Sequence, residues 1–282
     1  MLAIALQGCS RDTLFAHIGH KTCAISESGL GRLTYRPLAS SSDRRVFLWN
    51  QTALAYEKVT YEYDWSGAQA AFRRALELNP NSADTHYLYA LTWLTPTGRR
   101  DEAIGEIKKA LALDPVSLPR NAGAGYVFYY ARRYQDALDQ CGRTISLDPS
   151  YPQGQWRCFE AYRQLGRYDD AIREKEKAWL LDGEDRRTVE AATAALRQAT
   201  AKSGERGYWQ QEVEIYKRFA SPVAVADAYA RLAKTNDAFE WLEKGFQSRD
   251  SDAVMVAVDP NLDSIRSDPR YKNLLRRIGL PQ

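Results

Sequence analysis

The 282-residue sequence has little of what catalysis and metal binding most often use, with only three histidines and four cysteines. Four cysteines in a chain of this length do not make up a disulfide framework. No apolar run approaches the roughly 20 residues that a membrane-spanning helix needs, so we expect no membrane span. The net charge is only +3, and acidic and basic residues are interleaved along the chain. This pattern disfavours a nucleic-acid partner, because proteins that bind nucleic acid concentrate Lys and Arg on one face.

The first residues carry two incomplete motifs. Four side chains could be drawn as a zinc site, but they lack the close cysteine pair that marks one: Cys9, His17, His20 and Cys23. The stretch Leu6-Gln7-Gly8-Cys9 resembles a bacterial lipoprotein cleavage box, yet no Lys or Arg precedes it and its apolar segment is short. We therefore predict no metal and no cofactor, and we expect residues 1–47 to be a poorly ordered or misassigned leader.

Prolines recur at nearly constant spacing in the next part of the chain. Pro80, Pro115 and Pro149 end the stretches "LELNP", "LALDP" and "ISLDP", and a fourth stretch, "WLLDG", ends at Gly183. The apolar residues before each ending have helical spacing, and proline stops a helix because it cannot donate the next backbone hydrogen bond. The sequence therefore predicts a repeating helix with a period near 34 residues.

Small residues stand at fixed distances before each ending, where they let two helices approach to about 8 Å. The positions twelve and five residues before the endings hold Ala68, Ala103, Ala137 and Ala171, then Ala75, Ala110, Thr144 and Ala178. The position between them holds a residue that fills space in three copies, Phe72, Ile107 and Cys141, and Lys175 breaks this pattern in the fourth. The position two before each ending is leucine in every copy.

A second helical segment precedes each of these helices. It repeats a small residue and then a large one, at Ala55, Ala90, Ala124 and Cys158, followed by Val59, Leu94, Phe128 and Tyr162. Each unit is thus helix–turn–helix, with glycine in two turns and Arg132 in another. The pattern resembles the tetratricopeptide repeat, although the family's tryptophan near the start of the first helix is absent. The resemblance implies an all-α fold, a right-handed α-solenoid of stacked antiparallel helix pairs.

The repeat pattern divides the chain. We expect four tetratricopeptide-type repeats over residues 48–183 and two degenerate helix pairs over residues 184–250. Residues 251–282 then form a capping segment, because the hydrophobic face of a terminal repeat has no further neighbour. Within it, Asp259-Pro260 and Asp268-Pro269 each predict a cap followed by a short helix.

The end of the chain has a second resemblance. The stretch "WLEKGFQSRDSDAVMVAVDPNLDSIRSDPRYKNLLRRIGLP" looks like the tail of a bacterial group in which tetratricopeptide arrays follow a regulatory head. In that group the head is a winged-helix DNA-binding domain, a protein kinase or a nucleotide cyclase. No such head matches within residues 1–47.

Candidate catalytic groups have simpler interpretations. Cys141 and Cys158 occupy packing positions, where free cysteine behaves as a small hydrophobe, and no histidine lies in register to activate either one. The acidic pairs Asp101-Glu102 and Asp169-Asp170 stand at helix starts, where carboxylates favour the helix dipole. We therefore predict that the protein is not an enzyme. Free cysteines also favour the cytoplasm, with export or lipid anchoring through Cys9 as the alternative.

The first helices of a stacked array line its concave side, and several of their side chains have the composition of binding hot spots. We predict a partner-binding surface there, made of Tyr89, Thr92, Tyr126, Tyr129, Trp156, Glu160 and Arg163. A groove of this shape suits an extended or helical peptide. The sequence favours a non-catalytic scaffold that binds a peptide or protein. The alternative is the orphan regulatory half of a bacterial signalling protein that lacks its head domain.

Overall fold

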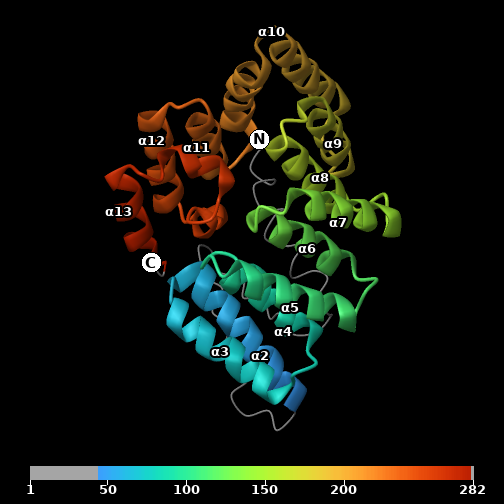
Figure 1. Cartoon of the computed structure of the whole chain (residues 1–282), viewed down its shortest axis with the longest axis vertical. Coiled ribbons are helices and arrows are strands. Elements are labelled where there is room, and N and C mark those ends of the chain that lie inside the picture. Colours follow the sequence, from blue (N-terminus) through green and yellow to red (C-terminus); the bar gives the residue numbers. More distant parts are fainter. Residues whose placement is uncertain (1–43, 281–282) are drawn as a thin grey trace, which may run out of the picture. The chain divides into compact units, whose positions relative to one another are not determined.

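A computed structural model describes residues 44–280, which lie within one compact unit and contain helices but no strand. The interpretations placed on Cys9, His17, His20 and Cys23 fall outside the described residues. Short 3-10 and π-helical segments (η) continue or connect several α-helices (Figure 1). The prediction of an all-α solenoid is confirmed.

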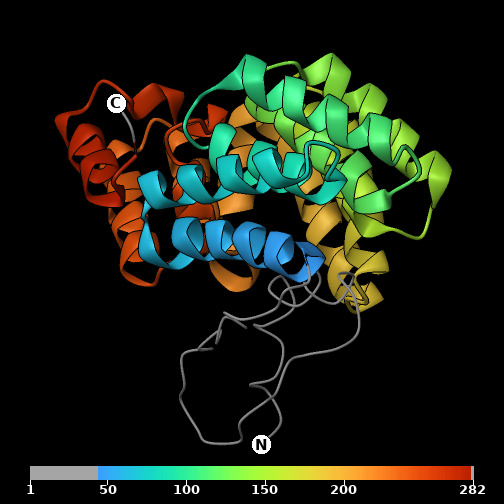
Figure 2. The same ribbon diagram turned by 90° about the horizontal axis from the view of Figure 1, so that it is seen from below.

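The helices follow one another as antiparallel neighbours (Figures 1 and 2). In chain order they are α2 (Arg44–Glu57) with η1 (Lys58–Glu62), α3 (Trp65–Leu78), α4 (Ala83–Tyr89) with η2 (Ala90–Leu94), α5 (Arg100–Leu113), α6 (Leu118–Tyr130), α7 (Tyr134–Leu147), α8 (Pro152–Gln164), α9 (Tyr168–Leu181), α10 (Arg186–Phe219), α11 (Pro222–Arg231), α12 (Thr235–Gln247), η3 (Ser251–Met255), η4 (Pro260–Ile265) and α13 (Pro269–Ile278). The backbone of α10 leaves the helical conformation at Ser203 and Gly204, so this element has two arms.

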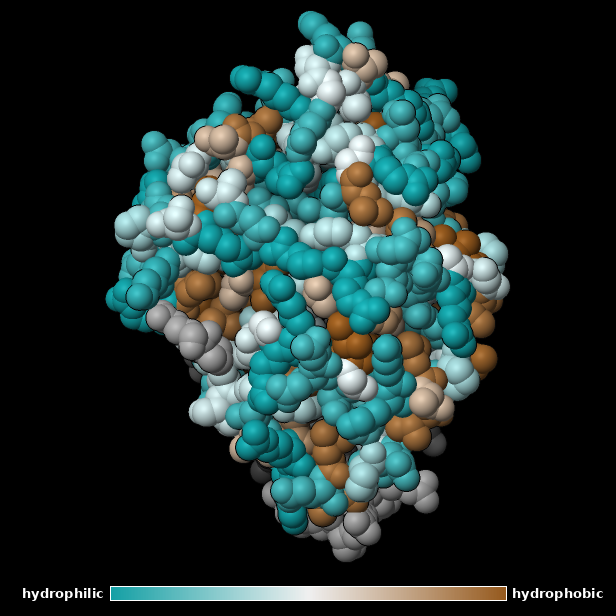
Figure 3. Space-filling view, in the orientation of Figure 1, coloured by the Kyte–Doolittle hydropathy of each residue, from teal (hydrophilic) through white to brown (hydrophobic). Residues whose placement is uncertain are grey.

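The repeating small residues make the contacts between helices. All eight are buried with no more than 1% of their surface exposed: Ala68, Ala75, Ala103, Ala110, Ala137, Thr144, Ala171 and Ala178. The position between them is equally buried, even where Lys175 replaces an apolar residue. The leucines near the helix ends differ, because Leu113, Leu147 and Leu181 remain about 40% exposed (43%, 40% and 39%). The space-filling view shows a largely hydrophilic face with scattered small apolar patches (Figure 3).

The turns between paired helices need a left-handed residue. Gly98 and Gly166 take positive φ angles of 75° and 70°, as expected for glycine. Arg132 and Ala233 stand at the matching turns of other pairs with φ of 67° and 57°. A side chain in this conformation costs about 1–2 kcal/mol, which the packed helices on either side must offset.

The acidic pairs at helix starts lie in the first turn, as predicted, but the residue before each helix is an arginine. Arg99 precedes α5 and binds Glu102 through two nitrogens, each 2.6 Å from a carboxylate oxygen. Arg167 precedes α9 and donates to Asp170 at 2.7 Å. The carboxylates therefore hold in place the arginine that precedes each helix, in addition to favouring the helix dipole.

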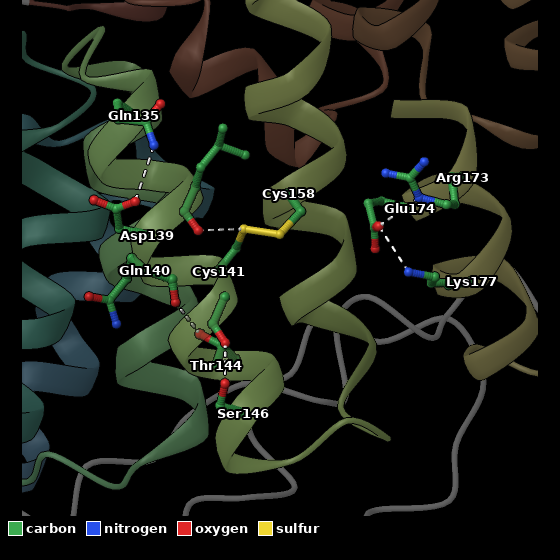
Figure 4. Close-up of a disulfide and its surroundings, with 12 residues drawn as sticks. Gln135, Asp139, Gln140, Cys141, Thr144, Ser146, Cys158, Arg173, Glu174 and Lys177 are labelled. Atoms are coloured by element: carbon green, nitrogen blue, oxygen red, sulfur yellow. Dashed lines mark hydrogen bonds and ion pairs between the residues drawn. A yellow bond between two sulfur atoms is a disulfide. The ribbon is translucent and has the colours of Figure 1, made fainter. Parts of the chain in front are cut away.

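Cys141 and Cys158 form a disulfide that joins α7 to α8 (Figure 4). Their Cα atoms lie 5.5 Å apart, within the ordinary range for such a bond. The prediction that these two cysteines are free is therefore wrong. Both were correctly placed at packing positions, and those positions bring the two sulfur atoms together between adjacent helix pairs.

The last helix returns to the first described repeat. The indole Nε1 of Trp65 on α3 donates to the carbonyl oxygen of Ile278 on α13 at 2.9 Å, and Gly279 lies against the same indole ring. Tyr63 stacks on Phe246 of α12, with 6.4 Å between the ring centroids. Figures 1 and 2 both place α13 beside the start of α3.

The caps expected in the C-terminal segment are confirmed. Asp259 accepts a hydrogen bond from the backbone N–H of Asn261 at the start of η4, and Asp268 accepts from that of Arg270 at the start of α13. The apolar face of α13 is buried at Tyr271, Leu274 and Ile278.

Candidate functional site

The predicted concave residues divide into buried and partly exposed groups. Tyr89 is 8% exposed, and its ring packs between Phe72 and Trp93, with centroids 5.1 and 5.6 Å away. It therefore belongs to the core between repeats. Thr92 is half-buried and donates its hydroxyl to the carbonyl of Leu88 in its own helix at 2.7 Å.

Tyr126 and Glu160 lie on either side of one arginine that the sequence prediction missed. The guanidinium of Arg157 sits 5.0 Å from the centroid of the Tyr126 ring and forms a 2.8 Å ion pair with Glu160. The side chains of Arg157 and Glu160 are 15% and 22% exposed, but the two atoms that form the pair, Arg157 Nη1 and Glu160 Oε2, are buried. Burial raises the pKa of Glu160, and the positive charges of Arg157 and Arg163 act against that rise.

Tyr129 and Arg163 are held by contacts within the chain. The Tyr129 hydroxyl accepts hydrogen bonds from Gln164 Nε2 at 3.1 Å and from Asn261 Nδ2 at 3.4 Å. Arg163 donates to the Tyr216 hydroxyl at 2.8 Å and lies over the ring of Trp209, 5.0 Å from its centroid. Both side chains are buried, so their first role is to join helices.

Trp156 contacts the end of the following helix. Its indole Nε1 donates to Asp182, just after α9, at 2.8 Å, and its ring meets Trp179 edge-on at 6.3 Å. Burial raises the pKa of Asp182, and the bond from Trp156 acts in the opposite direction. The indole remains partly exposed.

The C-terminal segment supplies residues to this face that the sequence did not predict. Asp263 binds both terminal nitrogens of Arg132, at 2.6 and 2.8 Å. Asn261 accepts from Gln164 Nε2 at 2.7 Å and donates to Tyr129. These contacts join side chains about 100 to 130 residues apart in sequence. Because a repeat pattern specifies only neighbours one unit apart, no signal in the sequence pointed to them.

Two further hollows lie at other places in the described residues. A cavity of about 480 Å³ between the arms of α10 and the α11–α12 turn includes Lys202, Lys217, Tyr229 and Lys234 in its wall. A second, of about 510 Å³, lies beside Tyr63 and Phe246. Within residues 44–280 no group of three or more His, Cys, Asp or Glu side chains is placed to hold a metal ion.

One family model matches part of the repeating region of the chain. The tetratricopeptide repeat model matches residues 63–117 and 123–187. The predicted tetratricopeptide-type repeats are therefore supported over these two ranges. The structure of PilF from Pseudomonas aeruginosa is similar, with a TM-score of 0.50 and 20% identity over 73% of this chain and 93% of that one. A thermophilic TPR protein from Thermus thermophilus is 18% identical, with a TM-score of 0.45, over 81% of this chain and 99% of that one.

Two curated proteins match by sequence. Small glutamine-rich tetratricopeptide repeat-containing protein 2 from Mycosarcoma maydis is 30% identical over 87 residues, which are 31% of this chain and 24% of that protein. A DnaJ homolog subfamily C member 7 homolog from Dictyostelium discoideum is 24% identical over 184 residues, 62% of this chain and 32% of that protein. The chain thus spans about a quarter of the length of the first relative and about a third of the second.

These matches support the tetratricopeptide-type repeats. They do not support the resemblance to the tails of signalling proteins. Tetratricopeptide repeats present surfaces for protein partners, so the comparisons support a protein-interaction scaffold. No helix of the described part of the chain is both long and apolar enough to cross a membrane.

Proposed function

We propose that the protein is a non-catalytic scaffold that binds a peptide or protein partner on the concave face of α6 and α8. The observation that carries this proposal is the partly exposed group of Tyr126, Arg157 and Glu160, in which one guanidinium stacks on an aromatic ring and pairs with a carboxylate. Arginine and tyrosine side chains of this kind are the ones enriched in binding hot spots.

The surface for the partner is narrower than the seven residues expected from the sequence. Tyr89, Tyr129 and Arg163 are buried in contacts within the chain. The partly exposed members are Thr92, Tyr126, Trp156 and Glu160, and Arg157 joins them. The mild net charge of +3 favours a protein over a nucleic acid as the partner.

The test is to capture partners from the native cell with the tagged full-length chain, and to compare variants by quantitative mass spectrometry. We expect Glu160→Ala and Trp156→Ala to lower recovery of a specific partner by at least about tenfold, as the loss of a hot spot does. The control is Lys108→Ala, because Lys108 is exposed on α5. Equal recovery by all variants, or recovery of no specific partner, would contradict the proposal.

The ending of the chain supports a second function, the regulatory half of a bacterial signalling protein whose head is a winged-helix domain, a kinase or a cyclase. The genomic sequence upstream decides this question. A kinase, cyclase or winged-helix coding region, in frame or adjacent, would support it, and the lack of all three would exclude it.

The oxidation state of Cys141 and Cys158 indicates the compartment in which the protein is found. We expected the cytoplasm on the ground that the cysteines are free, but Cys141 and Cys158 form a disulfide. Disulfides persist mainly in oxidising compartments, so we propose the exported alternative. Alkylation of thiols in intact cells, followed by mass spectrometry of this pair, tests it. An alkylated, reduced pair would return the prediction to the cytoplasm.

A further inference from the structure

Asn261 lies at a junction of four parts of the fold. It is 1% exposed at the start of η4. Its side chain reaches Tyr129 of α6, Gln164 of α8 and Asp227 of α11. The chain around it, residues 256–266, is here called the C-terminal latch. Its apolar side chains are almost completely buried, at Val256, Val258, Leu262 and Ile265.

Two buried carboxylates flank Asn261 from different elements. Asp259 belongs to the latch, is 5% exposed and accepts from the backbone N–H of Asn261 at 2.7 Å. Asp227 belongs to α11, is 8% exposed and accepts from Asn261 Nδ2 at 3.4 Å. The other oxygen of Asp227 has no hydrogen-bond partner among the described residues. A buried carboxylate that lacks a full set of donors is costly to ionise.

The charged groups around this pair only partly compensate for its burial. Arg163 of α8 and Arg266 of the latch are the cations that face it. Glu160 of α8 and Asp252 of η3 add negative charge when they ionise, and burial raises the pKa of both, that of Asp252 to about 6. The other titratable groups nearby are tyrosines, at positions 129, 130, 216 and 271, and burial raises the pKa of each hydroxyl, so they stay neutral. Two acidic side chains, one from α11 and one from the latch, thus both contact Asn261 where the latch is docked.

We propose that the C-terminal latch is a pH-responsive cover of the concave face, docked while the Asp227–Asp259 pair retains a proton and loosened when both side chains ionise. The latch lies on the face that the proposed function uses, so its release would enlarge the surface open to a partner. That consequence rests on the proposed function, whereas the latch itself can be tested without any partner.

The direction of the pH effect follows from the two carboxyl groups. Burial raises the pKa of Asp259 from 3.8 to about 6, and burial together with the negative charge of Asp259 raises that of Asp227 well above 3.8. A released latch therefore binds fewer protons than a docked one above pH 4, and docking weakens as the pH rises through about 6. Asp263 acts oppositely only in stronger acid, because Arg132 and Arg266 hold its pKa below 3.8.

The experiment is amide hydrogen exchange of the full-length chain at about pH 5 and about pH 7.5, with rates corrected for the intrinsic effect of pH. We expect the opening equilibrium of peptides within residues 256–266 to increase at least about tenfold at the higher pH. In the double variant D227N/D259N, we expect a much smaller pH response than in the wild type, because only Asp252 and Glu160 still titrate beside the latch. Asp237→Asn on α12 removes an exposed carboxylate and should keep the wild-type response.

Three results would overturn the proposal. One is equal protection of the wild-type latch at both pH values, and another is an unchanged pH response in the double variant. The third is a response that extends equally to α2–α5, which would reveal global unfolding in place of latch release. If the double variant does not fold, D227N alone is used and should reduce the response. Failure of partner capture with a normal latch response would instead count against the proposed function.

Discussion

Trp65 and Ile278 are joined by a hydrogen bond between residues 213 positions apart, from the indole Nε1 of one to the carbonyl oxygen of the other. Trp65 is 6% exposed, and its backbone oxygen in turn accepts from the indole of Trp93 at 2.8 Å. A buried indole hydrogen bond therefore joins the first described repeat to the last helix.

Trp65→Phe tests the value of this bond. The substitution keeps an aromatic ring but removes the donor, so the Ile278 carbonyl loses a partner. We expect a loss of about 1–3 kcal/mol in the free energy of unfolding, with faster amide exchange in α13. The control is Trp156→Phe, which removes a partly exposed indole donor to Asp182 and should cost less. Equal losses in both variants would mean that the bond to Ile278 contributes no more to the free energy of unfolding than a partly exposed indole hydrogen bond does.

His86 gives the second prediction, because both of its ring nitrogens face acceptors. Nδ1 lies 2.5 Å from a carboxylate oxygen of Glu106, and Nε2 lies 2.7 Å from the carbonyl oxygen of Pro80. The hydrogen bond to Glu106 raises the pKa of His86 above 6.5. The protonated ring thus stabilises the fold fully below pH 6.5, and this contribution is lost as the pH rises through the raised pKa.

An NMR titration of the His86 imidazole measures that pKa directly. Glu106→Gln should move it back toward 6.5, whereas Glu102→Gln, which alters a more exposed carboxylate paired with Arg99, should leave it unchanged. A wild-type pKa at or below 6.5 would show that the short contact with Glu106 does not hold a proton.

The buried pair of Lys175 and Glu212 gives the third prediction. Lys175 donates to Glu212, which also accepts from the Tyr208 hydroxyl at 2.6 Å, and the lysine and glutamate side chains are 1% and 0% exposed. Burial lowers the pKa of Lys175 to about 8, although the charge of Glu212 and its hydrogen bond act to raise it. Lys175→Met would leave a buried carboxylate without its cation, which costs about 3–5 kcal/mol.

Urea unfolding of three variants separates the causes. Adding Glu212→Gln to Lys175→Met should recover much of the loss, because the remaining side chain carries no charge. Lys177→Met removes a lysine that is 52% exposed and paired with Glu174, and should change stability by less than about 1 kcal/mol. A loss of that small size in Lys175→Met would show that the buried pair contributes little.

The disulfide gives the fourth prediction. Cys141 and Cys158 are 17 residues apart, and closing a loop of about this length stabilises a protein by about 3 kcal/mol in the chain-entropy estimate. Reduction should lower the free energy of unfolding by about 2–4 kcal/mol. A variant with alanine at both positions should be insensitive to reductant. Thiol titration of the unreduced, denatured protein checks the bond itself, and four reactive thiols would show that it does not form.

The sequence was sufficient for the parts of the fold that depend on neighbours one repeat apart. Ala68, Phe72 and Ala75 were placed in the core by spacing alone, because a helix presents the same face every three or four residues. Spacing also located Lys175 at a core position. Spacing could not explain why a lysine stands there, because its partner Glu212 belongs to α10 and follows no repeat pattern.

The candidate site was less predictable. The repeat predicts that α6 and α8 line the concave face, but whether a side chain there remains accessible depends on what packs over it. Arg132 was recognised only as an unusual turn residue, and its partner Asp263 stands 131 positions later. Contacts of that range depend on the accumulated curvature of the stack, which no local pattern encodes.

The contact between α3 and α13 also changes how the molecule should lose its structure. In an open stack an end unit has one neighbour, so unfolding begins there and spreads unit by unit. The contact of Trp65 with α13 gives the first described repeat a neighbour on a second side. That repeat is therefore no longer a free end from which unfolding can begin. Unfolding of residues 44–280 should therefore be a single cooperative transition, whereas a variant that lacks the Trp65 contact should unfold gradually from its ends.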